Sequence, residues 1–146
     1  MSKTNYIPQG ISPITPQLVI NGAAKAIEFY TKAFGGELLH SMPDPKTGAV
    51  MHAAVRIGEG VFFISDATAF AKPTTSNTYV YVRDVDAVFE RAVKAGATVL
   101  SPLANMFWGD RWGMVADPFG NQWQLGCKVE DVSPEEMGKR MAQLPK

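Results

Sequence analysis

Several common features are scarce or missing in this sequence, and each absence argues against a class of protein. Basic and acidic residues balance, with 14 of each among 146 residues, so no basic stripe favours nucleic-acid binding. No apolar run approaches the ~20 residues that a bilayer-spanning helix requires. No polybasic cluster indicates attachment to a lipid surface. We therefore expect neither a nucleic-acid partner nor a membrane partner.

Cysteine is nearly absent as well. The single cysteine, Cys127, cannot form an internal disulfide, which fits a reducing compartment. The first 17 residues lack the apolar central region of a secretory signal peptide. These two observations predict a cytoplasmic location.

The sequence does contain one structural pattern twice. Each half shows a strand, an amphipathic helix and three further strands, and the halves superpose at an offset of 62 to 63 residues. Ala23, Ala26, Ile27, Tyr30 and Phe34 form the apolar stripe of the first helix. The strands are expected over 14–20, 37–41, 50–57 and 61–65 in the first half, and over 77–82, 98–100, 112–116 and 122–127 in the second.

This repeat predicts a single α+β domain over residues 1–146. Module one spans about 11–66, a linker 67–76, module two 77–128 and a helical tail 129–146. Asp84 is the expected N-cap of the second helix, with a stripe from Val85 to Val93, and Ser133 is the expected N-cap of the tail helix. Amphipathic strands in both halves imply two curled sheets with helices outside and a cleft inside.

The stretch GDRWGMVADPFGNQWQL, residues 109–125, presents two uncharged amides where chemistry would favour an acid or a base. Strand alternation puts Gln122 and Gln124 on one face, and Trp123 and Leu125 on the other. Asp110 and Arg111 are expected to form a local ion pair or to cap the loop. Asp117 fits an Asx-type turn before Pro118.

Together with AAKAIEFYTKAFGGEL and VRDVDAVFERAVKAGATVLSP, this stretch resembles the vicinal oxygen chelate superfamily. That superfamily includes glyoxalase I, extradiol dioxygenases and bleomycin-resistance proteins, and the DPFGNQW turn and SPEEM tail are similar to its single-domain, PhnB-like branch. The resemblance implies mixed sheets curled around a cleft, and a homodimer. It also maps the four metal-ligand positions of the catalytic members onto Thr15, His52, Asn77 and Gln124.

Those four residues are a poor donor set for a divalent ion, because only one is an imidazole and none is a carboxylate or thiolate. We therefore expect no cofactor; if a divalent metal does bind, His52 and Gln124 are its ligands. The same face is instead suited to an organic ligand, with phenols, amides and overhanging indoles. The predicted ligand-binding residues are Thr15, Gln17, His52, Arg56, Asn77, Tyr79, Tyr81, Trp108, Trp112, Gln122 and Gln124.

The sequence is compatible with three functions, and it leaves open whether any reaction is catalysed. The first is a small-molecule-binding protein of the bleomycin-resistance type that holds an organic ligand in the cleft without the usual metal. The second is a metal-dependent lyase, isomerase or transferase of the glyoxalase I type. The third is a structural dimer module with a vestigial pocket. No Ser–His–Asp or Cys–His arrangement supplies a nucleophile with its base, which favours the first.

Overall fold

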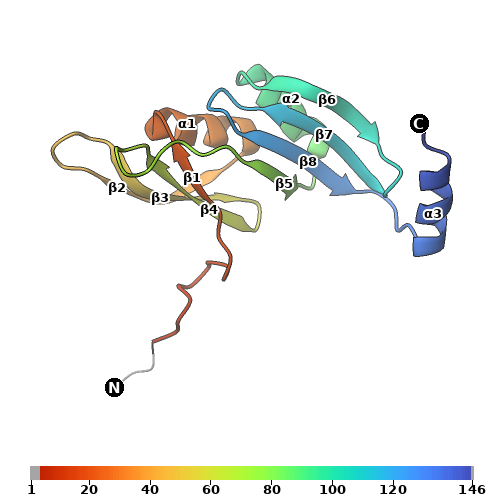
Figure 1. Ribbon diagram of the computed structural model, residues 1–146, viewed down its shortest axis with the longest axis horizontal. Coiled ribbons are helices and arrows are strands. Elements are labelled where there is room, and N and C mark those ends of the chain that lie inside the picture. Colours follow the sequence, from red (N-terminus) through yellow and green to blue (C-terminus); the bar gives the residue numbers. More distant parts are fainter. Residues whose placement is uncertain (1–3, 146) are drawn as a thin grey trace. The chain divides into compact units, whose positions relative to one another are not determined.

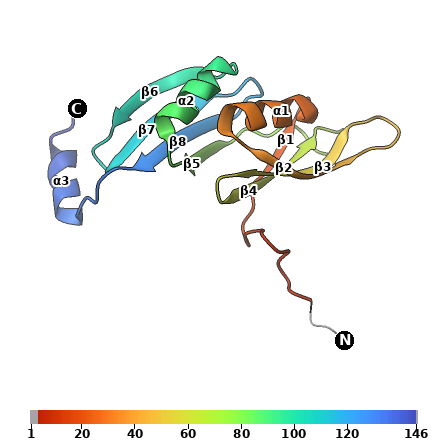
Figure 2. The same cartoon turned by 180° about the vertical axis from the view of Figure 1, so that it is seen from behind.

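The structure is a computed structural model that describes residues 4–145 (Figures 1 and 2). Within these residues the chain forms two compact units, which divide between Ser76 and Asn77. No helix within the described part of the chain is long and apolar enough to cross a membrane.

The first unit is a four-stranded sheet with one helix along one face, and its strands lie in the order β1-β4-β3-β2. β1 and β4 are parallel, and the other neighbours are antiparallel. Its elements are β1 (Gln17–Ile20), α1 (Ala23–Phe34), β2 (Glu37–Pro43), β3 (Val50–Ile57) and β4 (Gly60–Asp66).

The second unit repeats this arrangement, with strand order β5-β8-β7-β6 and a parallel β5–β8 pair. The tail helix α3 follows the last strand. The elements are β5 (Asn77–Tyr81), α2 (Val85–Lys94), β6 (Thr98–Asn105), β7 (Asp110–Ala116), β8 (Gln122–Lys128) and α3 (Pro134–Ala142). The chain is therefore α+β with two βαβββ modules, which confirms the predicted fold class.

Strand alternation decides which face of each sheet is buried beneath its helix. In the first unit the ring of Tyr30 on α1 meets Phe62 on β4 edge-on, with 5.5 Å between ring centroids. In the second unit Trp123 and Leu125 are buried on the helix side. Gly113 is needed there, because a Cβ would lie 2.6 Å from the Phe89 ring of α2. The opposite face of each sheet carries the residues that alternate with the buried ones, among them Gln17 in the first unit and Gln124 in the second.

The helices have well-defined caps, and the two that the sequence predicts, Asp84 and Ser133, are present. Gly35 ends α1 in the left-handed conformation, with φ of 67°. Asp84 caps α2 by accepting a hydrogen bond from the Ala87 N–H at 3.1 Å, and Ser133 caps α3 by accepting one from the Glu136 N–H at 3.1 Å.

Some predicted bounds are wrong. β1 begins at Gln17 rather than at residue 14, because Pro16 has no N–H for the ladder and contributes only its carbonyl, which accepts from Phe63 N at 2.8 Å. β6 continues to Asn105 through Pro102, which an edge strand tolerates. The predicted stripe of α2 is too long, since Val93 is exposed.

Asp117 does more than the turn role predicted for it. Its Oδ1 accepts from the backbone N–H groups of Phe119 and Asn121, at 2.8 and 3.0 Å. Its Oδ2 accepts from the buried indole Nε1 of Trp123 at 2.9 Å. One buried carboxylate therefore shapes the turn and fixes the largest side chain beneath α2.

We predict that Asp117→Asn lowers the free energy of unfolding by about 2–3 kcal/mol. An amide can retain one acceptor oxygen, but its NH₂ group would then face either backbone N–H groups or the Trp123 indole. Urea denaturation measures the change. Asp44→Asn is the matched control, because Asp44 makes the same kind of Asx contact, to Lys46 N at 2.8 Å, in an exposed turn. Equal losses in both variants would contradict this role of Asp117.

Candidate functional site

The open face of the second sheet carries most of the predicted site residues. Register pairs Asn77 with Gln122, Tyr79 with Gln124 and Tyr81 with Gly126. Gln122 and Gln124 lie on the side away from the buried Trp123, as the alternation predicts. The predicted residues of this unit therefore share one surface.

A buried carboxylate organises this surface. Asp110, the first residue of β7, is only 4% exposed. Its Oδ2 accepts from the hydroxyls of Tyr79 at 2.5 Å and Tyr81 at 2.9 Å, and from the Trp108 indole Nε1 at 3.1 Å. Three aromatic side chains from two distant segments thus converge on one oxygen atom. We refer to Asp110, Tyr79, Tyr81 and Trp108 as the carboxylate cluster.

The cluster keeps both phenols protonated. Burial and the hydrogen bond to Asp110 raise the pKa of Tyr79 far above its usual range. The hydrogen bond to Asp110, followed by burial, raises the pKa of Tyr81. Both hydroxyls are therefore hydrogen-bond donors at neutral pH, and neither is prepared to act as a base.

Gly126 provides the space for this arrangement. The Tyr79 ring must lean across β8 to reach Asp110 on β7, and it does so directly above Gly126. A Cβ at position 126 would lie 2.7 Å from Tyr79 Cε1 and 2.8 Å from its hydroxyl oxygen. A glycine at this point of the strand is thus a requirement of the cluster.

A second set of hydrogen bonds runs through the amides. The Trp112 indole Nε1 donates to Gln124 Oε1 at 3.0 Å, and Gln124 Nε2 donates to Asn77 Oδ1 at 2.9 Å. An indole N–H can only donate, so it fixes the orientation of the Gln124 amide, which in turn fixes that of Asn77. We call these three residues the amide chain; it leaves the Asn77 NH₂ group as its terminal donor.

The two sets meet through their indoles. The rings of Trp108 and Trp112 lie 5.6 Å apart at 70°, and those of Tyr79 and Tyr81 lie 5.0 Å apart. The predicted Asp110–Arg111 pair does not form. Arg111 points to the helix side, where its guanidinium donates to both carboxylate oxygens of Asp86 at 2.7 and 2.8 Å.

The first-unit residues of the predicted site are held differently. Gln17 Nε2 donates to Ser65 Oγ at 3.0 Å, and Arg56 forms an exposed ion pair with Glu37. The His52 ring contacts Phe63, with centroids 4.7 Å apart, and His40, with centroids 5.2 Å apart. These side chains share the open face of the first sheet, but their contacts are local and solvent-exposed or half-buried.

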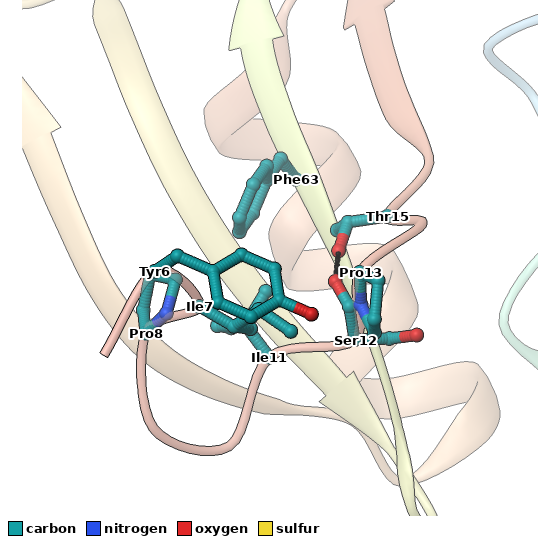
Figure 3. A pocket seen from close by; sticks show the side chains of 8 residues that line it. All are labelled: Tyr6, Ile7, Pro8, Ile11, Ser12, Pro13, Thr15 and Phe63. Atoms are coloured by element: carbon teal, nitrogen blue, oxygen red, sulfur yellow. Dashed lines mark hydrogen bonds between the residues drawn. The ribbon is translucent and has the colours of Figure 1, made fainter.

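Thr15 lies outside the strands. It lines a pocket of about 400 Å³ formed where the residues before β1 approach Phe63 (Figure 3). The Thr15 hydroxyl donates to the carbonyl of Ser12 at 2.8 Å. The pocket is lined by Tyr6, Ile7, Pro8, Ile11, Ser12, Pro13, Thr15 and Phe63.

The repeat also shows which positions correspond between the two units. Gln17 and Tyr79 each lie six residues before the first residue of their helix, so they are equivalent. Their parallel partners are Phe63 and Gln124. The first-unit equivalent of Gln124 is therefore a phenyl ring, and His52 lies on the adjacent strand β3.

The side chains at the family's metal positions do not fit a divalent ion. The oxygens of Asn77 and Gln124 already accept hydrogen bonds. Phe63, the first-unit equivalent of Gln124, offers no donor atom. Among residues 4–145 no group of three or more His, Cys, Asp or Glu side chains is placed to hold a metal ion.

Comparison with known proteins identifies the family. Residues 10–125 match the Glyoxalase/Bleomycin resistance protein/Dioxygenase superfamily, and the chain therefore belongs to that superfamily. An uncharacterized protein of Mycobacterium tuberculosis is 39% identical over 140 residues, which cover 88% of this chain and 82% of the relative. The putative glyoxylase CFP32 of the same species is 32% identical over 144 residues; this chain spans only 54% of it.

Solved structures share the fold. TioX from a Micromonospora species is 27% identical with a TM-score of 0.69, over 81% of this chain and 99% of TioX. TnmS3, an antibiotic binding protein from a Streptomyces species, is 24% identical with a TM-score of 0.64, over 82% of this chain and 98% of TnmS3. The likeness to TnmS3 shows the fold alone.

We predict that Gly126→Ala displaces the Tyr79 ring and lowers the free energy of unfolding by about 1–3 kcal/mol, as overpacking does. Chemical denaturation measures the loss, and the tyrosine ring resonances report the displacement. Gly138→Ala serves as control, because a Cβ there meets nothing within 4 Å. An unperturbed Tyr79 ring in Gly126→Ala would contradict the contact.

The pKa shifts predict how stability depends on alkaline pH. A tyrosine whose pKa is raised in the folded state stabilises the fold fully below its unfolded pKa of about 10, and this contribution is lost as the pH rises further. Asp110→Asn should lower the pKa of Tyr79 and Tyr81 and flatten this loss. Urea unfolding at neutral and alkaline pH tests it, with Asp86→Asn as control. An unchanged pH slope in Asp110→Asn would refute the coupling.

Proposed function

We propose that this protein binds a small organic molecule with a flat aromatic part on the open face of the β5-β8-β7-β6 sheet, without a metal ion. The proposal rests on the hydrogen bonds that the polar groups of this face make to aromatic side chains. Asp110 and Gln124 hold aromatic side chains in place through direct hydrogen bonds, rather than being available for proton transfer.

Preorganised aromatic side chains favour binding. Tyrosine and tryptophan offer large contact areas with few rotatable bonds, and a side chain already fixed loses little entropy when a ligand packs on it. The carboxylate cluster and the amide chain fix four such side chains. Tyr81 remains 62% exposed, so part of this aromatic surface is accessible within its own unit.

The amide chain adds a directional polar contact. Because Trp112 sets its orientation, the chain ends in the NH₂ group of Asn77, which is exposed. Two N–H donors beside aromatic rings favour a ligand that carries a carbonyl or similar acceptor at the edge of its flat part.

The same geometry disfavours acid–base catalysis by these residues. Asp110 Oδ2 already accepts three hydrogen bonds, and the raised pKa values of Tyr79 and Tyr81 keep their protons in place at neutral pH. An antibiotic-binding protein on this fold, TnmS3, is in keeping with a role in binding. A homodimer and a cytoplasmic location stay predictions.

A thermal-shift screen tests the proposal. The probes are planar aromatic antibiotics and, for the glyoxalase-type alternative, α-ketoaldehyde–thiol adducts. A probe present at 100 times its Kd should stabilise the fold by roughly 2.7 kcal/mol. Stabilisation by planar aromatic probes supports the proposal, whereas silence across both panels would favour the vestigial module.

We predict that Trp112→Ala weakens binding of a hit from that screen by tenfold or more, about 1.4 kcal/mol. The change removes one ring of the platform and leaves the Gln124 amide without the donor that orients it. Isothermal titration calorimetry measures Kd, and Phe70→Ala is the control, since Phe70 is a fully exposed aromatic side chain. Equal weakening in both variants would indicate non-specific aromatic contact.

Equilibrium dialysis of tag-free protein against Zn²⁺, Ni²⁺ and Mn²⁺ tests the metal alternative. We expect that the wild-type protein takes up none of these ions in a one-to-one complex. His52→Ala and Gln124→Ala should therefore leave the uptake unchanged. A one-to-one metal complex lost in these variants would overturn the metal-free part of the proposal and favour a lyase, isomerase or transferase.

A further inference from the structure

The tail helix α3 has an exposed position on its unit. None of its residues is buried, and it lies beyond the end of the sheet where β6 turns into β7 (Figures 1 and 2). A helix of nine residues without a buried face is not held by apolar packing alone. Its position must depend on particular side chains.

Arg140 supplies the best-defined attachment. Its guanidinium donates to both carboxylate oxygens of Glu130, at 2.6 and 3.3 Å, and to Glu136 Oε1 at 3.1 Å. It also donates to the backbone carbonyl of Phe107 at 3.0 Å. The side chain is 29% exposed, less than either carboxylate partner. Arg140 therefore joins α3, the segment after β8 and the β6–β7 hairpin.

That hairpin carries part of the proposed binding surface. Its turn is closed by Met106 N donating to the Asp110 carbonyl at 2.7 Å and by Gly109 N donating to the Met106 carbonyl at 3.1 Å. Trp108 lies in this turn, and Asp110 is the first residue after the turn. The Phe107 carbonyl that Arg140 binds belongs to the peptide group that connects Phe107 to Trp108.

The segment after β8 closes on the same turn. Both Val129 N and Glu130 N donate to the Gly109 carbonyl, at 2.9 and 3.2 Å. Gly109 has φ of 102°, and a Cβ there would lie 2.6 Å from the Glu130 carbonyl oxygen. Glu130 therefore contacts the turn through its backbone while its carboxylate holds Arg140.

We propose that Arg140 is a positioning residue that fixes the Trp108 indole on Asp110 by bracing the β6–β7 hairpin against the C-terminal helix. Its effect on Trp108 is independent of any ligand. Its effect on affinity rests on the proposed function, because Trp108 is part of the platform to which the ligand would bind.

The three tryptophans of the chain supply the readout. Each indole N–H donates to a different acceptor: Trp108 to Asp110, Trp112 to Gln124 and Trp123 to Asp117. A ¹H–¹⁵N spectrum of the ligand-free protein therefore contains one indole signal for each site. Single Trp→Phe variants assign the signals.

We predict that Arg140→Met shifts or broadens the Trp108 indole signal and leaves that of Trp123 unchanged. Arg140→Lys should restore it in part, because lysine keeps the charge but cannot span the same acceptors. Lys139→Met is the matched control, since it removes the neighbouring charge of α3. For a hit from the screen, Arg140→Met should raise Kd on the order of fivefold.

Each outcome bears on one proposal. An unchanged Trp108 signal in Arg140→Met, or equal changes of the Trp108 and Trp123 signals, would overturn the positioning role of Arg140. A selective change of the Trp108 signal with unchanged affinity for a hit would show that Arg140 positions Trp108 without affecting ligand binding. If the Trp108 signal changes selectively in Arg140→Met and no probe binds the wild-type protein, the positioning role of Arg140 is supported and the proposed function is contradicted.

Discussion

The open face of the second sheet depends on a single constraint, the burial of the Asp110 carboxylate. A buried charge is costly unless hydrogen-bond donors surround it, and among residues 4–145 no lysine or arginine side chain is hydrogen-bonded to this one. Three neutral aromatic donors, Tyr79, Tyr81 and Trp108, take that role. They give up rotational freedom to do so, and a set of fixed rings results.

A second buried aspartate performs the corresponding task on the other side of the same sheet. Asp117 anchors Trp123 under α2 and shapes the turn between β7 and β8. The two carboxylates stand at the two ends of β7, one at its first residue and one just after its last. The strand between them is therefore flanked by two charge-assisted anchors, one serving the core and one the exposed surface.

Local patterns in the sequence predict the fold well. The spacing of apolar residues in α1, the caps at Asp84 and Ser133, and the duplicated strand order all depend on near neighbours, and the structure confirms them. The alternation of Gln122 and Gln124 with Trp123 likewise predicts the face on which the amides lie.

The role of Asp110 depends on partners 29 and 31 residues away, which no local pattern contains. A charged residue beside Arg111 is typical of a surface ion pair, and of the two predicted alternatives the Asp110–Arg111 ion pair does not form, because Arg111 binds Asp86. The sequence does contain one indication of this cluster. Tyr79 and Tyr81, two residues apart, must point to the same side of β5, and Gly126 leaves space for a ring on the adjacent strand. The predicted start of β1 at residue 14 was wrong for another reason: Pro16 has no N–H to donate, so the strand begins at Gln17.

The duplicated modules have diverged on their open faces while keeping the same strand order. The position of Tyr79 is Gln17 in the first unit, and that of Gln124 is Phe63. Neither exchange keeps the hydrogen bonds of the second unit, because a phenyl ring has no amide oxygen to accept from an indole N–H and Gln17, which donates to Ser65 on β4, has no phenol hydroxyl. In each unit the burial of the helix-side face maintains the fold, which leaves the residues of the opposite face free to change. Within residues 4–145 the carboxylate cluster and the amide chain thus belong to the second module, and this is why the proposed binding surface lies there.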